Sequence, residues 1–195
     1  LMSWSPLLDV LTHRVLVADG AMGTMLQSIP LSLDDFAGLE GCNEILNVTR
    51  PDVVRAVHRG YLEAGADAVE SNTFGANLAN LAEYDIADRI RELAEAGATL
   101  AREVADEFTE PDRPRFVLGS VGPGTKLPTL GHVSFAELRD AYLEQVRGLL
   151  AGGADAVLVE TSQDLLQCKA AVIAARRAMI IEGRHVPIIT QVTLE

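Results

Sequence analysis

The pentapeptide GADAV stands at residues 65–69 and again at residues 153–157. In each copy a glycine ends a stretch of helical periodicity, and an apolar run typical of a buried strand begins. Strands and helices alternate along the chain, with strands predicted over residues 15–17, 66–74, 116–120, 155–161 and 188–195. Strict alternation of this kind predicts an α/β fold with a parallel sheet.

Two architectures fit this alternation. A doubly wound sheet can be complete at five strands, whereas a (β/α) barrel of TIM type needs about eight units. Polar residues end four successive predicted strands, at Asp19, Thr73, Ser120 and Glu160. Strand ends converge on one mouth in a barrel, so we expect a TIM-type barrel of which this chain supplies about the first five of eight β/α units. Residues 1–195 are then the N-terminal part of a single barrel domain.

The composition argues against several classes of partner. The chain of 195 residues has a formal net charge of -12, which repels nucleic acid and anionic membrane surfaces. No apolar run reaches the roughly 18 residues that a membrane span needs. Two cysteines, Cys42 and Cys168, match neither a disulfide framework nor a metal-binding pair, which favours a cytoplasmic setting.

The segment VLVADGAMGT, residues 15–24, leads an apolar strand into an acidic residue and two glycines. Its first three residues predict a strand buried on both faces, with Asp19 where that strand meets solvent. Glycine at residues 20 and 23 lets backbone N–H groups approach a ligand closely. The long connection that follows, residues 25–48, has no firm periodicity, and a loop of this length in a compact domain often serves a site.

Five segments, read together and in order, resemble the homocysteine methyltransferase family, and most closely the N-terminal homocysteine-binding domain of its cobalamin-dependent members. They are VLVADGAMGTMLQ, GCNEILNVTRPDVV, GADAVESNTFGAN, GSVGPGTKLPTLGH and GADAVLVETSQDLLQCKAA. The resemblance implies a β/α barrel in which a zinc ion held by cysteine thiolates binds the homocysteine sulfur. That sulfur then attacks the methyl group of methylcobalamin to give methionine. Zinc coordination lowers the pKa of a thiol while leaving the sulfur nucleophilic.

The resemblance implies that six residues bind the amino-acid end of homocysteine, and these are Asp19, Gly20, Ala21, Thr73, Ser120 and Glu160. Asp19 and Glu160 would pair with the substrate ammonium group. Gly20 and Ala21 would offer backbone N–H groups to its carboxylate, and the hydroxyls of Thr73 and Ser120 would line the pocket. Glu70 is expected to have a structural role in the wall.

The zinc-binding cysteines of the family come from later strands of the barrel. Cys42 and Cys168 are not expected to replace them, so we expect neither a metal site nor a catalytic residue in this chain, and no activity from it alone. Zinc, cobalamin, and the folate, cobalamin and reactivation domains are implied for a longer protein. Two alternatives are a homocysteine methyltransferase that uses betaine or S-methylmethionine, and a non-catalytic five-stranded binding module. Exposed barrel edges also predict self-association.

Overall fold

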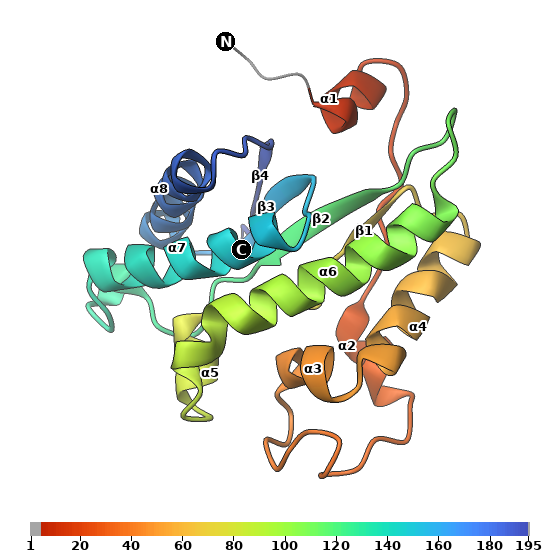
Figure 1. The fold of residues 1–195 in the computed structure, drawn as a ribbon. Helices are drawn as coiled ribbons and strands as arrows, with labels where there is room; N and C mark the ends of the chain where they lie inside the picture. The colour runs from red at the N-terminus through yellow and green to blue at the C-terminus, as the bar shows by residue number, and fades with distance from the viewer. Residues whose placement is uncertain (1–4, 195) are drawn as a thin grey trace.

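The computed structural model describes residues 5–194 and contains a parallel sheet of four strands (Figure 1). The strands are β1 (Ala68–Glu70), β2 (Phe116–Val121), β3 (Ala156–Ser162) and β4 (Ile188–Val192). They lie in the order in which they occur in the sequence, and each pairs in parallel with the next. The α/β fold with a parallel sheet is therefore confirmed.

The helices connect successive strands. Those before and between the strands are α1 (Pro6–Leu11), α2 (Met22–Gln27), α3 (Leu46–Thr49), α4 (Pro51–Glu63), α5 (Leu78–Ala82), α6 (Ile90–Phe108), α7 (Phe135–Ala151) and α8 (Leu165–Glu182). Three short 3₁₀ turns accompany them, at Asn43–Ile45, Ala87–Arg89 and Pro128–Leu130. The Ser134 hydroxyl accepts a hydrogen bond from Glu137 N–H and so caps the start of α7.

The predicted first strand is only partly formed. Ala18 makes an isolated parallel bridge to Ala68, and Asp19 N–H donates to the Ala68 carbonyl at 3.0 Å. The prediction that residues 15–17 are buried on both faces is wrong, because Val15 is 83% exposed and Val17 is 58% exposed. β1 covers one edge of this segment, and within residues 5–194 no further strand pairs with its other edge.

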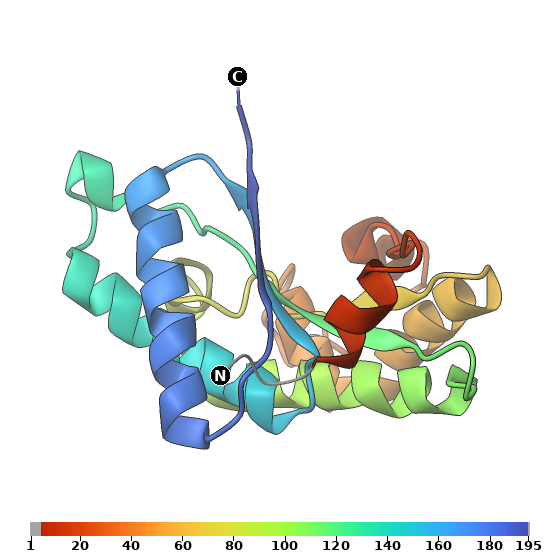
Figure 2. The same cartoon turned by 90° about the horizontal axis from the view of Figure 1, so that it is seen from above.

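The two faces of the sheet carry different layers. Val69, Val117 and Val157 point toward the helices and pack in the largest apolar cluster with α6, α7 and α8. The alternate residues of the strands point to the opposite face, where Leu7 of α1 covers them. Figure 2 shows α1, in red, on the other side of the strands from α6, in green. Side-chain alternation along each strand produces this separation.

The two GADAV copies form the same structure. Asp67 accepts a hydrogen bond from Val17 N–H at 3.0 Å, and Asp155 accepts one from Val117 N–H at 2.8 Å. Each aspartate also pairs with an arginine, Arg14 for Asp67 and Arg102 for Asp155. The glycine that opens each copy has a positive φ, 105° in the first and 97° in the second, which L side chains rarely adopt. The repeat therefore ties the start of one strand to the strand before it.

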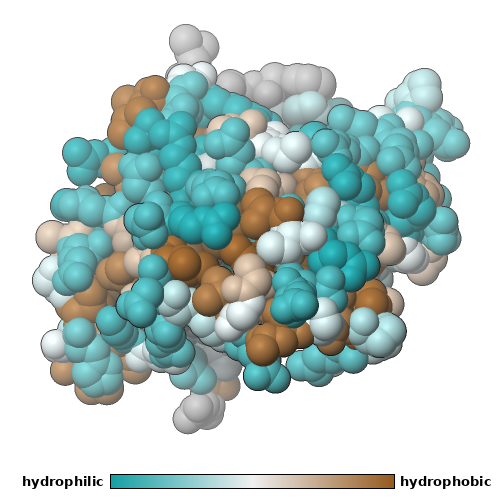
Figure 3. All heavy atoms as spheres, turned by 60° about the horizontal axis from the view of Figure 1, so that its bottom comes forward, coloured by the Kyte–Doolittle hydropathy of each residue, from teal (hydrophilic) through white to brown (hydrophobic). Residues whose placement is uncertain are grey.

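The surface mixes polar and apolar residues, as Figure 3 shows for one face of the molecule. Several exposed apolar side chains lie near the two edges of the sheet, among them Val17, Val192 and Leu194. None of the helices within residues 5–194 combines the length and the apolar character that crossing a membrane requires.

Replacing Asp155 by alanine is expected to lower the free energy of unfolding by about 2–3 kcal/mol, because Val117 N–H is left buried without its acceptor. Asp106→Ala is the matched control, since Asp106 pairs with the same Arg102 but is 66% exposed at its side chain. The control should change stability by less than about 1 kcal/mol. Urea denaturation of the two variants measures both values. Equal losses would show that the backbone hydrogen bond is not the important contact.

Candidate functional site

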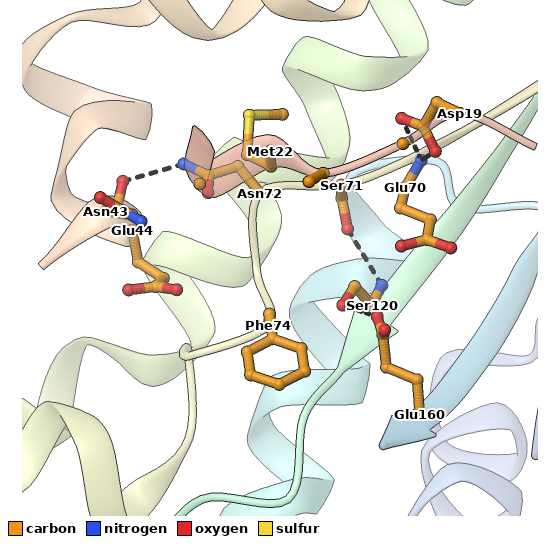
Figure 4. Close-up of a pocket in the computed structure, with 13 residues that line it drawn as sticks. Asp19, Met22, Asn43, Glu44, Glu70, Ser71, Asn72, Phe74, Ser120 and Glu160 are labelled. Atoms are coloured by element: carbon orange, nitrogen blue, oxygen red, sulfur yellow. Dashed lines mark hydrogen bonds between the residues drawn. The ribbon is translucent and has the colours of Figure 1, made fainter. Parts of the chain in front are cut away.

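The carboxyl ends of the strands surround a cavity of about 410 Å³ (Figure 4). Five of the six residues predicted to bind substrate line it, and these are Asp19, Gly20, Ala21, Ser120 and Glu160. The other lining residues are Met22, Gly23, Asn43, Glu44, Glu70, Ser71, Asn72 and Phe74. The structure therefore brings together side chains from four separate strand ends and from the long loop before α3.

Strand alternation places three polar side chains on the same face. Ala68, Leu118 and Leu158 belong to the apolar cluster on the face opposite the helices. Glu70, Ser120 and Glu160 each follow one of these residues by two positions and so point to that same face. Apolar residues thus fill the lower part of this face, and polar residues occupy its carboxyl end. Figure 4 shows Glu70, Ser120 and Glu160 next to one another.

Hydrogen bonds fix the acidic side chains of Asp19 and Glu160 at the cavity. Both carboxylate oxygens of Asp19 accept from Glu70 N–H, at 3.0 and 3.1 Å. The Ser120 hydroxyl donates to Glu160 Oε1 at 2.5 Å. The strand ends therefore position the carboxylates of Asp19 and Glu160, while the Glu70 carboxylate lines the cavity beside them.

The site favours a positively charged ligand. Burial raises the pKa of Asp19 to about 8, and the nearby carboxylates of Glu70 and Glu160 add to the shift, while the hydrogen bond from Glu70 N–H opposes it. Burial also raises the pKa of Glu70 to about 7, helped by Glu160. Within residues 5–194, no lysine, arginine or histidine forms an ion pair with these three carboxylates. An ammonium group in the cavity would supply the missing positive charge.

The glycine segment is held against α4. Tyr61 of α4 donates a hydrogen bond from its hydroxyl to the Ala21 carbonyl at 3.0 Å. A Cβ atom at Gly20 would lie 3.1 Å from that hydroxyl oxygen, so glycine permits this close approach. The backbone of residues 20 and 21 consequently lies at the wall of the cavity.

Thr73 lies behind the wall rather than on it. Its side chain is fully buried, and its hydroxyl donates to the Ser120 carbonyl at 2.7 Å and shares a second hydrogen bond with Ser71. The prediction that the Thr73 hydroxyl lines the pocket therefore does not match the geometry. Thr73 ties the end of β1 to the end of β2, and it contacts the lining residues Ser71 and Ser120 from behind.

Sequence reasoning missed several residues of the site. Glu70 was expected to be structural, although its alternation with Ala68 places it with Ser120 and Glu160. Asn43 and Glu44 come from the long connection before α3. This segment has no periodicity from which the direction of its side chains could be predicted. Glu44 is 5% exposed and accepts a hydrogen bond from Gly75 N–H at 2.7 Å, which secures this loop beside the cavity.

The described residues do not form a metal site. Within residues 5–194, no group of three or more histidine, cysteine, aspartate or glutamate side chains is arranged to hold a metal ion. Cys42 is buried beside Glu44, and Cys168 is half-buried on α8, and both are free thiols. The residues that line the cavity thus offer carboxylate and backbone groups and include no cysteine or histidine.

The fold and the cavity define a small-molecule site at the carboxyl end of a parallel sheet. The chain belongs to the homocysteine S-methyltransferase family, whose model matches residues 16–195. The resemblance noted in the sequence is thereby confirmed.

Two curated relatives are methionine synthases. The one from Mycobacterium tuberculosis is 67% identical over 189 residues, and the one from Mycobacterium leprae is 65% identical over the same length. The match covers 97% of this chain and 16% of each relative, so the chain spans about a sixth of their length.

Solved structures of the homocysteine methyltransferase MmuM from Escherichia coli share the fold. The metallated form has a TM-score of 0.74 at 23% identity, and the match covers 95% of this chain and 66% of that one. The apo form has a TM-score of 0.70 at 24% identity, with 98% and 64% covered.

Asp19→Asn is expected to make the stability of the fold less dependent on pH. Between the usual pKa of 3.8 and the folded value of about 8, the folded protein keeps a proton that the unfolded chain has released, so stability falls as pH rises. The amide does not titrate but still accepts from Glu70 N–H. The variant should lose less stability than the wild type between pH 5 and 8, by on the order of 3 kcal/mol.

Urea denaturation at pH 5, 6.5 and 8 measures this difference. Asp112→Asn is the control, because Asp112 is exposed and does not line the cavity. The stability of this variant should depend on pH as the stability of the wild type does. Parallel stability curves for the wild type and Asp19→Asn would contradict the raised pKa.

Proposed function

We propose that this chain forms the amino-acid end of the homocysteine site in a methionine synthase, an enzyme that transfers a methyl group from methylcobalamin to homocysteine. The observation that carries the proposal is the cavity lined by the carboxyl side chains of Asp19, Glu70 and Glu160 and by the backbone of residues 20 and 21. A zwitterionic amino acid needs both kinds of partner. Membership of the homocysteine S-methyltransferase family and the identity of 67% to a methionine synthase support this choice.

We also propose that residues 1–195 are part of a single β/α barrel of TIM type and supply about the first five of its eight units. The sequential order of four parallel strands supports this. The parallel bridge of Ala18 to Ala68 of β1 also supports it, because it places a fifth segment next to β1 in the same sequential order. The structural similarity to MmuM covers about two thirds of that chain, in keeping with five of eight units.

Each predicted binding residue has a proposed role in this site. Asp19 and Glu160 accept hydrogen bonds from the substrate ammonium group, and Gly20 and Ala21 donate backbone N–H groups to the substrate carboxylate. Ser120 holds the Glu160 carboxylate in place through its hydroxyl. Thr73 supports Ser120 from behind, in place of the direct contact expected from the sequence.

The cofactors are part of the proposal. Zinc, when bound, would lower the pKa of the homocysteine thiol, and cobalamin would carry the methyl group. The residues described here do not fit a zinc site, so we propose that other residues of a longer protein hold the metal. Cobalamin, folate and reactivation domains would belong to that same protein, and this chain alone is expected to be inactive.

The proposed site is tested by methyl transfer in the protein as its gene encodes it. Asp19→Asn and Glu160→Gln should each lower kcat/KM for homocysteine roughly 30- to 1000-fold, because each removes one charged partner of the ammonium group. Asp112→Asn should leave it unchanged. Methylcobalamin, betaine and S-methylmethionine are offered separately as donors. Activity only with betaine or S-methylmethionine would replace the cobalamin proposal, and no affinity for homocysteine would favour a non-catalytic binding module.

We propose a cytoplasmic location, since Cys42 and Cys168 are both free thiols, which a reducing compartment preserves.

Self-association of this chain is expected through the edge formed by β4. Val192 on that edge is 45% exposed, and an unpaired edge strand invites pairing with another copy. Light scattering should show a mass that rises with concentration, and Val192→Lys should reduce the rise. A constant monomeric mass at high concentration would rule this out.

A further inference from the structure

Glu70 supplies a further carboxylate to the cavity beside Asp19 and Glu160, and the roles proposed above do not use it. It ends β1, and its backbone N–H donates to Asp19. Its side chain lines the cavity together with Asp19 and Glu160. Asp19 accepts hydrogen bonds from Glu70 N–H, and Glu160 accepts one from Ser120, whereas within residues 5–194 the Glu70 carboxylate forms no such hydrogen bond and no ion pair.

A purely structural role does not account for this arrangement. A carboxylate that stabilises a wall is normally paired with a cation or accepts hydrogen bonds, as Asp67 and Asp155 do at the other end of the same sheet. Glu70 instead lies partly buried beside two other carboxylates, and burial, together with repulsion from Glu160, raises its pKa. Its position therefore costs stability in the free protein and becomes favourable only with a cation in the cavity.

We propose that Glu70 is a specificity-determining residue that makes the site require a free ammonium group on its thiol substrate. This inference rests on the proposed function and deepens it. With homocysteine, one positive charge lies among Asp19, Glu70 and Glu160 and offsets their repulsion. A thiol acid without the amino group brings only its own negative carboxylate into the cavity, so the third carboxylate increases the penalty against it.

The test compares homocysteine with 4-mercaptobutanoate, which has the same thiol and carboxylate but lacks the amino group. Their kcat/KM values are measured for methyl transfer in the protein as its gene encodes it, and the ratio of the two values is the readout. Glu70→Gln should reduce the ratio at least tenfold, by lowering turnover of homocysteine and raising that of the analogue. The amide has nearly the same shape, and the backbone hydrogen bond to Asp19 is retained.

Two further variants separate charge from packing. Glu70→Asp keeps the charge and should retain most of the discrimination. Glu63→Gln removes an exposed carboxylate of α4 and should leave the ratio at its wild-type value. If Glu70→Gln does not fold, Glu70→Asp still tests the inference. This variant keeps the charge, so the loss of all discrimination between homocysteine and 4-mercaptobutanoate would overturn the role of Glu70.

The outcomes also distinguish this inference from the proposed function. Wild-type turnover of homocysteine together with an unchanged ratio in Glu70→Gln overturns the role of Glu70 alone. An equal loss for both substrates indicates a structural role and likewise overturns it. Absence of homocysteine turnover by the wild type with all three methyl donors overturns the proposed function and the inference with it.

Discussion

The fold depends on how β1 and β3 are tied to the segments that pair with them, residues 17–18 and β2. Asp67 and Asp155 stand just before β1 and β3, and each accepts the backbone N–H of a residue in the preceding strand. Their own N–H groups donate to the carbonyls of those same residues, Val17 and Val117. A parallel pair has no tight turn to set its register, so paired contacts of this kind fix it instead. Once the register is fixed, the carboxyl ends of the strands are aligned as well.

This alignment places polar side chains at the carboxyl ends of the strands, beyond the apolar cluster on the face opposite the helices. Leu7 and the alternate residues of β2 and β3 fill the face opposite the helices near the start of the strands. Beyond them, Glu70, Ser120 and Glu160 face the cavity. The helix side of the sheet carries the larger apolar cluster, which offsets the unfavourable gathering of carboxylates on the other side. The protein thus gathers carboxyl groups at its cavity at some cost to its own stability, an arrangement typical of binding sites.

The sequence predicted the alternation of strands and helices, and five of the six proposed binding residues do line one cavity. Two features were misjudged for physical reasons. Residues 15–17 are apolar enough for a buried strand, but burial depends on neighbours that the described chain does not place over Val15 and Val17. Thr73 ends a strand as Ser120 does, yet the chain turns after Ser71, so the hydroxyl of Thr73 reaches the Ser120 carbonyl behind the wall. Polarity at a strand end does not reveal on which side of the wall the group lies.

The sequence by itself determined the parallel α/β fold and the chemical character of the strand ends, because repeats, glycine positions and apolar periodicity are local properties of the chain. The resemblance of five segments, read in order, indicated the family. Only the tertiary structure decided which polar groups meet. Asn43 and Glu44 join the cavity because hydrogen bonds from Asn72 and Gly75 hold their loop there. Glu70 joins it because strand pairing aligns it with Ser120 and Glu160. Such contacts link residues far apart in the chain, and their energies depend on burial and on neighbouring charges, which exist only once the chain is folded.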